Sequence, residues 1–345
     1  MIRALAGRLR PVLPPPLRRA ARAVLLAWGW LTADLRQEPD IVVVGAQRAG
    51  TTTLFRLLSE HPDLCRPTVD KGTGYFDDGY RHGRRWYRAH FPLRRTARGR
   101  RTFECSGYYL FHPLAADRLA RDLPGCQVVA LVRDPVARAH SAHRHESARG
   151  FENLPFADAV ALEAVRTAGQ AHLLVTDPGA ASFAHRHHAY LQRGEYAVQL
   201  ARYVTALGRE RVHVVDAGAL FADPVGVYVD LQRRLGLTVH RPDEVGRWNE
   251  RPGDPLPPDL AAALRRRFDG PDAALAELLG RTPSWREEAS CRDPRPGACD
   301  ATPERPVGGV AVARQTPSPP SRRRLADAPL WRRSQRRPTT DRGTK

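Results

Sequence analysis

A short run of β-branched residues before a glycine-containing loop is the feature that most constrains the fold. Residues 41–44 read Ile-Val-Val-Val, which is typical of a buried strand in a parallel sheet. Residues 45–50 form the loop, and residues 51–60 have the apolar spacing of a helix. This order builds an anion site, because loop amides and the helix N-terminus point at one spot. We therefore expect an α/β protein that binds a phosphate-like group.

Strands and helices alternate along the rest of the chain. Residues 128–132 and 212–215 are further apolar β-branched runs, and residues 102–106 are a candidate strand. Asp-Pro pairs at 134–135 and 223–224 predict capped helix starts, and residues 260–279 form a last helical region. The pattern predicts a P-loop-like three-layer α/β fold with a central parallel sheet flanked by helices.

Composition divides the chain into three parts. Residues 1–38 are a basic leader that we expect to be partly helical, and residues 39–286 are the predicted folded domain. Residues 287–345 are rich in proline and arginine, with few large apolar side chains, and are predicted to be disordered.

The leader contains an apolar run at residues 23–33, which is shorter than the roughly 18 to 20 residues needed to span a bilayer. We predict a cytoplasmic protein. Two interpretations of the leader stay open, namely a helix in peripheral contact with a membrane and a helix packed on the domain.

The net charge of +18 is compatible with a polyanionic partner. Lysine occurs only at positions 71 and 345, so 55 − 2 = 53 of the basic residues are arginine, which also fits a skewed genomic base composition. No recognised nucleic-acid motif occurs, and we predict no specific nucleic-acid partner. The 5 cysteines form no C-x-x-C pair and the histidines no H-E-x-x-H pattern, so we predict no metal site.

The loop differs from that of a nucleotide kinase. A kinase-type loop ends in Gly-Lys-Ser/Thr, whereas here Thr51 follows Gly50 and the cation is Arg48. The kinase lysine acts with Mg²⁺ on a polyphosphate. A ligand with fewer phosphates has less charge to neutralise, so we expect a single cation without a metal to be enough. A nucleotide or sugar kinase with a degenerate loop is a less favoured alternative.

Residues 44–54 and 131–141 resemble the 5′-phosphosulfate loop and the 3′-phosphate motif of the PAPS-dependent sulfotransferases. PAPS is 3′-phosphoadenosine-5′-phosphosulfate, and the likeness is to the branch of bacterial and heparan sulfate sulfotransferases. Residues 193–203 are similar to the family's R-G-x-Y-x-x-Q-L-x-x-Y helix, and the resemblance spans about residues 40–285. It assigns the following residues to the nucleotide: Gly45, Gln47, Arg48, Ala49, Gly50, Thr51, Thr52, Arg133, Ser141, Arg193 and Gly194.

The resemblance is weaker at the catalytic base. Heparan-type relatives have a glutamate base in a Lys-Glu-x-His-Phe-Phe-Asp segment, and residues 71–77 here read Lys-Gly-Thr-Gly-Tyr-Phe-Asp. Glycine therefore stands where the family has its base. The candidate catalytic residues are Arg48, Lys71, Asp77 as the first substitute base and His112 as the second. Further alternatives for the base are Asp70, His82 and Glu104.

The resemblance implies an enzyme that moves a sulfonate group from PAPS to a hydroxyl or amine. The acceptor that it implies is a carbohydrate, a glycolipid or a small metabolite. Because the expected base is absent, a non-catalytic homologue that binds PAPS is the alternative from another functional class.

Overall fold

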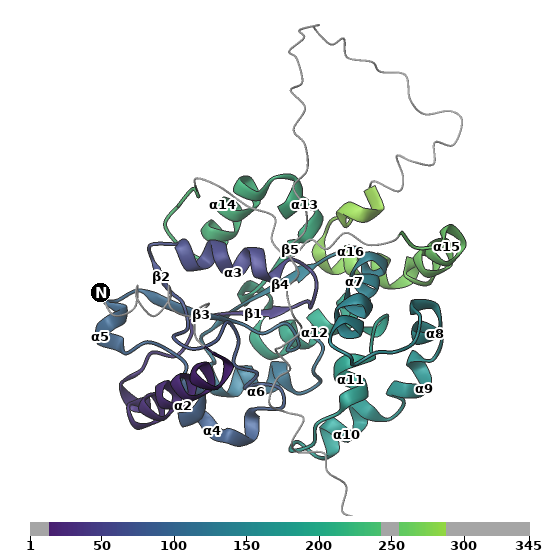
Figure 1. Cartoon of the computed structure of the whole chain (residues 1–345). Coiled ribbons are helices and arrows are strands. Elements are labelled where there is room, and N and C mark those ends of the chain that lie inside the picture. The colour runs from purple at the N-terminus through teal and green to yellow at the C-terminus, as the bar shows by residue number, and fades with distance from the viewer. Residues whose placement is uncertain (1–13, 243–254, 288–345) are drawn as a thin grey trace, which may run out of the picture. The chain divides into compact units, whose positions relative to one another are not determined.

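The computed structural model describes residues 14–242 and 255–287 (Figure 1). All of these belong to the first of two units, Met1–Asp293, while the second unit, Pro294–Lys345, lies outside the described residues. The predicted disorder of residues 287–345 falls almost wholly outside the described part, as does the start of the leader. The three predicted boundaries therefore stay predictions.

Five parallel strands form one sheet in the order β2-β3-β1-β4-β5. Their bounds are β1 Ile41–Gly45, β2 Leu64–Cys65, β3 Arg101–Cys105, β4 Gln127–Val132 and β5 Val212–Asp216. The central strand β1 pairs Val42 with Glu104 of β3 and Val43 with Val129 of β4. Every residue of β1 is buried, which explains its uniformly apolar sequence. The predicted α/β fold with a central parallel sheet is confirmed.

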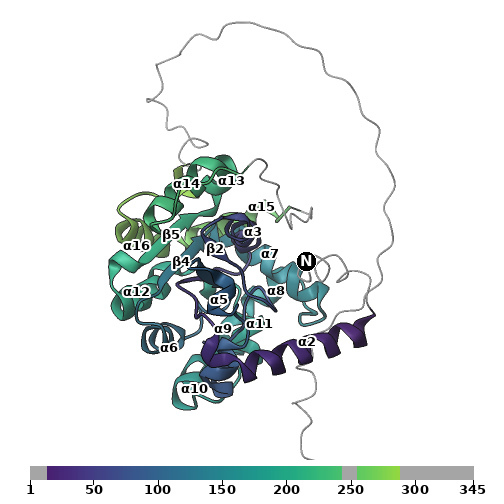
Figure 2. The same ribbon diagram turned by 90° about the vertical axis from the view of Figure 1, so that its left-hand side faces the viewer.

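Helices cover both faces of the sheet (Figures 1 and 2). On one face lie α3 (Thr51–Glu60) and α14 (Pro224–Arg234), joined by a 2.9 Å hydrogen bond from the Tyr228 hydroxyl to the Leu57 carbonyl. On the other face lie α6 (Ala115–Asp122) and α12 (Tyr196–Leu207), where the Tyr203 hydroxyl donates to the Tyr109 carbonyl at 2.7 Å.

The remaining elements surround these layers. Before β4 they are α2 (Pro15–Leu31), η1 (Ala33–Leu35), η2 (Tyr80–His82), α4 (Gly83–Arg88) and α5 (Arg94–Ala97). After β4 come α7 (Pro135–Ala148), α8 (Phe156–Ala161), α9 (Glu163–Thr167), α10 (Gln170–Thr176), α11 (Phe183–His187), η3 (Gln192–Gly194), η4 (Arg209–Arg211) and α13 (Ala217–Ala222). The region predicted at 260–279 is two helices, α15 (Pro258–Arg267) and α16 (Asp269–Leu279).

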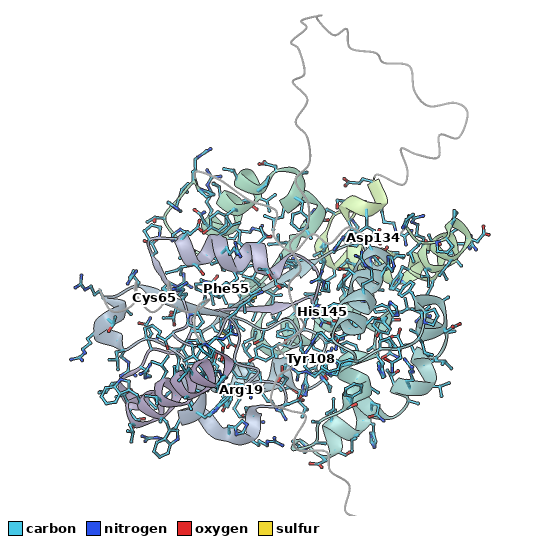
Figure 3. All side chains as sticks on the ribbon, in the orientation of Figure 1. Arg19, Phe55, Cys65, Tyr108, Asp134 and His145 are labelled. Atoms are coloured by element: carbon cyan, nitrogen blue, oxygen red, sulfur yellow. The ribbon has the colours of Figure 1, made fainter. Side chains whose placement is uncertain are left out.

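Both predicted Asp-Pro helix starts are confirmed. Asp134, labelled in Figure 3, directly precedes α7. Its carboxylate accepts hydrogen bonds from the backbone N–H groups of Val136 (2.8 Å) and Ala137 (3.2 Å). Asp223 accepts from the Gly226 N–H at 2.8 Å in the first turn of α14. The first cap fixes where α7 begins directly after β4, and α7 carries part of the site described next.

Candidate functional site

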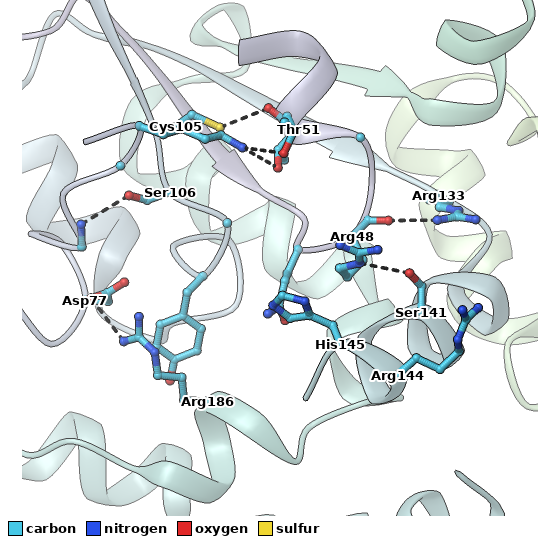
Figure 4. Close-up of a pocket in the computed structure, with 18 of the residues that line it drawn as sticks. Arg48, Thr51, Asp77, Cys105, Ser106, Arg133, Ser141, Arg144, His145 and Arg186 are labelled. Atoms are coloured by element: carbon cyan, nitrogen blue, oxygen red, sulfur yellow. Dashed lines mark hydrogen bonds and ion pairs between the residues drawn. The ribbon is translucent and has the colours of Figure 1, made fainter. Parts of the chain in front are cut away.

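A pocket of about 840 Å³ opens at the carboxyl ends of β1, β3 and β4 (Figure 4). Its lining comes from the loop 47–52, the segment 71–77, the turn 105–108 and one face of α7, with Arg133, Arg186 and Phe221. Ligands of open parallel sheets collect at this edge, and the volume is within the range of small-molecule sites. The predicted residues that line the pocket are Gln47, Arg48, Gly50, Thr51, Thr52, Lys71, Asp77, Arg133 and Ser141.

Arg48 and Arg133 join the two predicted anion-binding elements directly. The Arg48 Nε donates to Ser141 Oγ at 3.0 Å, and the Arg133 Nη1 donates to the Arg48 carbonyl at 3.1 Å (Figure 4). Arg48 has a φ of 70°, a left-handed conformation that is uncommon outside glycine and is concentrated at functional sites. The glycine-containing loop and the strand exit at Arg133 therefore face one shared pocket, as a single nucleotide requires.

Lys71 supplies an ammonium group to the loop from a neighbouring segment. Its Nζ donates to the hydroxyl oxygens of Thr51 (3.2 Å) and Thr52 (3.3 Å), the first residues of α3. Gly50, which precedes them, has a φ of 89° and so occupies a conformation that favours glycine. The loop thus gains the positive charge that a kinase-type loop carries on its own lysine.

Gly72 has no room for a side chain. A Cβ atom there would lie 2.3 Å from the Cys105 carbonyl oxygen and 2.5 Å from Ser106 Oγ. The segment therefore packs against the end of β3 through its bare backbone. A glutamate at this position would require the backbone to move, and Gly72 itself offers no side chain that could act as a base.

Asp77 lines the pocket as one partner of an ion pair. Its Oδ1 lies 3.6 Å from the Arg186 Nη1, which also donates to Asp78 Oδ2 at 2.5 Å (Figure 4). Burial raises the pKa of Asp77 to about 6, although the nearby Arg186 guanidinium acts in the opposite direction. The cation stabilises the ionised form and makes Asp77 a weaker base than its burial alone would.

Glu104 lies on β3 directly beneath the pocket wall and is fully buried. Its Oε2 accepts hydrogen bonds from the hydroxyl (2.9 Å) and the N–H (3.3 Å) of Thr73, which lines the pocket. In the described part of the chain its Oε1 has no hydrogen-bond partner. Burial raises the pKa of Glu104 to about 7, only partly offset by the Thr73 and Tyr109 hydrogen bonds. A carboxyl with this pKa can accept a proton near neutral pH.

His112 lies outside the pocket lining and is 2% exposed. Its Nδ1 accepts a hydrogen bond from the Leu114 N–H at 3.3 Å. Burial, followed by the charge of Arg118, lowers the pKa of His112 to about 2. These features argue against the predicted catalytic role of His112.

Arg193 was predicted to border the nucleotide, but it lies outside the pocket lining and binds the loop through Gln47. Its Nη1 donates to Gln47 Oε1, and its Nη2 donates to the His185 carbonyl at 3.1 Å. The Gln47 Nε2 in turn donates to Glu146 Oε1 at 3.1 Å, and the His187 Nδ1 lies 2.9 Å from Glu146 Oε2. Burial lowers the pKa of Arg193 to about 10, so the side chain stays charged at neutral pH.

Three other predicted residues also lie outside the pocket lining. A Cβ on Gly194 would lie 2.7 Å from Pro135 Cβ, so this glycine allows close packing against the start of α7. Gly45 is the last residue of β1 and Ala49 belongs to the loop that follows, and both are buried. Their places indicate that they shape the loop rather than contact a ligand.

Several pocket residues were not predicted, among them Thr73, Arg144, His145 and Arg186. Arg144 lies three positions after Ser141 on α7, so helical spacing from Ser141 could have indicated it. Arg186 lies on α11, which carries no recognisable motif. Within residues 14–242 and 255–287, no group of three or more Asp, Glu, His or Cys residues could hold a metal ion, and the predicted metal-free chemistry stays a prediction.

Known proteins match this chain over the part that builds the pocket. The family model "Sulfotransferase domain" matches residues 38–250, which is more than half of the chain. A crystal structure of a sulfotransferase from Alicyclobacillus acidocaldarius is 28% identical, with a TM-score of 0.57, over 72% of this chain and 99% of that one.

Curated relatives include the mouse (Mus musculus) bifunctional heparan sulfate N-deacetylase/N-sulfotransferase 1, 28% identical over 58% of this chain and 22% of that protein. Another is the mouse heparan sulfate glucosamine 3-O-sulfotransferase 3B1, 29% identical over 59% of this chain and 48% of that protein. This chain thus spans less than half the length of either relative. With the family model matched across the sheet and the pocket, the chain belongs to the sulfotransferase family.

Proposed function

We propose that this protein transfers a sulfonate group from PAPS to a hydroxyl or amine of a carbohydrate-type acceptor. The observation that carries the proposal is the linked set of Arg48, Ser141 and Arg133 in one pocket. It supports the binding of a ligand with two anionic ends. Membership of the sulfotransferase family supports PAPS as that ligand.

The residues of the pocket fit PAPS. The amides of the loop, the N-terminus of α3 and the side chains of Arg48 and Lys71 would hold the 5′-phosphosulfate. Arg133 and Ser141 would hold the 3′-phosphate through charge-assisted hydrogen bonds. When bound, PAPS supplies an activated sulfonate. Arg48 and Lys71 would stabilise the negative charge that develops on the leaving phosphate.

We place the catalytic base at Glu104, acting through Thr73. The Thr73 hydroxyl takes the proton of the acceptor while its own proton passes to Glu104 Oε2, 2.9 Å away. Glu104 forms no ion pair with a cation in the described structure, whereas Asp77 is held by Arg186. This difference favours Glu104 over Asp77, the first choice from the sequence.

The acceptor class is inferred from the names of the relatives, which act on heparan sulfate and its glucosamine. A glycolipid or a small metabolite stays an alternative. The pocket holds several cations and one carboxylate, Asp77, among its lining residues, so a neutral or anionic acceptor suits it better than a cationic one.

The test is a transfer assay with the full-length protein, ³⁵S-labelled PAPS and a panel of oligosaccharides, glycolipids and small alcohols and amines. We expect label on a carbohydrate acceptor, with the same rate in EDTA. Adenosine 3′,5′-bisphosphate should also raise the melting temperature more than ATP with Mg²⁺. Nucleotide protection without transfer to any acceptor would favour the non-catalytic homologue, and protection by ATP–Mg²⁺ alone would favour a kinase. The predicted cytoplasmic location stays a prediction.

A further inference from the structure

One face of the N-terminal helix α2 packs against the domain. Gly29 lies so close to the end of α4 that a Cβ atom there would be 2.4 Å from the carbonyl oxygen of Ala89, the residue after that helix. Arg22 forms a 2.7 Å ion pair with Asp70, and the Arg85 guanidinium lies 4.9 Å from the centre of the Trp30 ring. These contacts fix which side of α2 faces the protein, and Figure 2 shows the helix projecting from the side of the domain.

The opposite face of α2 is an exposed apolar stripe. Leu17, Val24, Trp28 and Leu31 are spaced by 7, 4 and 3 residues, which places them on one side of a helix. Their exposed fractions are 53%, 68%, 55% and 66%. A surface helix ordinarily turns its apolar stripe toward the core, whereas this one turns it toward solvent. Nothing in the described part of the chain covers the stripe.

The charge of the N-terminal segment as a whole indicates what covers the stripe. Residues 1–33 contain arginine at positions 3, 8, 10, 18, 19 and 22 and no aspartate or glutamate, and the first acidic residue is Asp34. A second copy of the chain would bring two such basic segments together, which like-charge repulsion opposes. A surface of anionic phospholipid attracts them instead. Trp28, which belongs to the stripe and is about half exposed, suits the boundary between headgroups and acyl chains.

We propose that α2 docks this protein on anionic phospholipid membranes, with the stripe of Leu17, Val24, Trp28 and Leu31 in the acyl boundary. The helix lies along the membrane surface, because its other face is held by α4 and Asp70. At 17 residues it is about 25 Å long, which gives an extended line of contact. The inference is independent of sulfonate transfer, since the stripe shares no residue with the pocket.

The test is co-sedimentation of the full-length protein with vesicles of phosphatidylcholine alone or mixed with phosphatidylserine. We expect binding to the mixed vesicles that weakens with added salt. The combined variant Val24→Ser, Trp28→Ser, Leu31→Ser should bind at least about tenfold more weakly, because the side chains that enter the membrane are polar. The matched control Val165→Ser, Val198→Ser, Val239→Ser removes exposed valines elsewhere and should bind like wild type.

An unchanged melting temperature and unchanged binding of adenosine 3′,5′-bisphosphate would establish that the α2 variant is folded. In solution without vesicles, its sulfotransferase rate should equal that of the wild type. If the wild-type protein does not bind vesicles that contain phosphatidylserine, the inference is wrong, whatever result the variants give. Equal vesicle binding by wild type and the α2 variant also overturns it. The inference is also wrong if the protein forms a dimer in solution without vesicles and the α2 substitutions dissociate it. In that case a second copy of the chain would cover the stripe.

Discussion

Arg133 serves the pocket in two ways, because its guanidinium lines the cavity and also donates to the Arg48 carbonyl. Under the proposed function, the substitution Arg133→Ala would remove a charge-assisted contact with the 3′-phosphate, and it removes the hydrogen bond to the Arg48 carbonyl in the loop. We expect binding of adenosine 3′,5′-bisphosphate to weaken by about 2 kcal/mol, or roughly 30-fold, in calorimetric titration. Arg121→Ala, on the exposed surface of α6, is the matched control and should bind like wild type. Equal affinity of the two variants would contradict the assignment of Arg133.

Glu104 is the residue whose ionisation should set the pH dependence of the reaction. Burial raises its pKa to about 7, and a base must be deprotonated, so kcat of the wild type should rise with pH through about 7. Glu104→Gln should lower kcat by about 100-fold or more and abolish this rise, while bisphosphate affinity is retained. The measurement is kcat against pH for both proteins.

Asp77→Asn is the comparison that separates the two carboxyls. Loss of the pH-dependent rise in this variant, with the rise intact in Glu104→Gln, would identify Asp77 as the base. Stability gives a second readout, because the folded-state pKa of Glu104 lies above its ordinary value of 4.5. The stability that this group contributes is therefore lost as pH rises from about 4.5 toward 7, and Glu104→Gln should lessen that loss.

Single residues were predictable where a motif fixes their spacing. Arg48, Arg133 and Ser141 follow from the loop and the strand exit, and they lie together in the pocket. The contact between Gln47 and Arg193 joins positions 146 residues apart, and no local pattern indicates it. Glu104 was named only as a further alternative, because its burial under Thr73 depends on tertiary packing.

At the scale of elements, the segment 71–77 depends on close backbone packing against the end of β3. Gly72→Ala places a Cβ 2.3 Å from the Cys105 carbonyl oxygen, so backbone must shift. We expect a loss of about 1–3 kcal/mol in the free energy of unfolding, measured by urea denaturation. At Gly125 an added Cβ meets no atom within 4 Å, so Gly125→Ala should unfold like wild type. A Gly72→Ala protein as stable as the Gly125 variant would show that the segment packs loosely.

The elements that the sequence predicts best are those buried on both sides. The strands β1, β4 and β5 are apolar along most of their length, and periodicity identifies them. The strand β2 has two residues and α8–α11 have five to seven each, which is too short for a periodic signal. The split between α15 and α16 at Phe268 was missed because the apolar spacing continues across it.

At the scale of the whole molecule, the proline- and arginine-rich end of the chain is expected to be dispensable for folding. The core lies in the sheet and its helices, and the last described core contact of the chain is made by Trp285. A protein that ends at Glu288 should therefore keep the melting temperature of the full chain, measured by calorimetry. Insoluble or unfolded protein after this truncation would contradict the predicted disorder of residues 287–345.

The hydrogen bond from Arg133 to the Arg48 carbonyl has a thermodynamic consequence for partial ligands. Because each half of the nucleotide site orders a residue of the other half, occupancy of one half should raise the affinity of the other by the same factor in both directions. Adenosine 3′-monophosphate and adenosine 5′-phosphosulfate each fill only one half of the site. Each should then bind far more weakly than it would if the binding free energy of the whole nucleotide were simply shared between the two halves. This coupling between the two halves would keep the binding of mononucleotides that carry only one of the two phosphates weak, even where they are abundant in a cell.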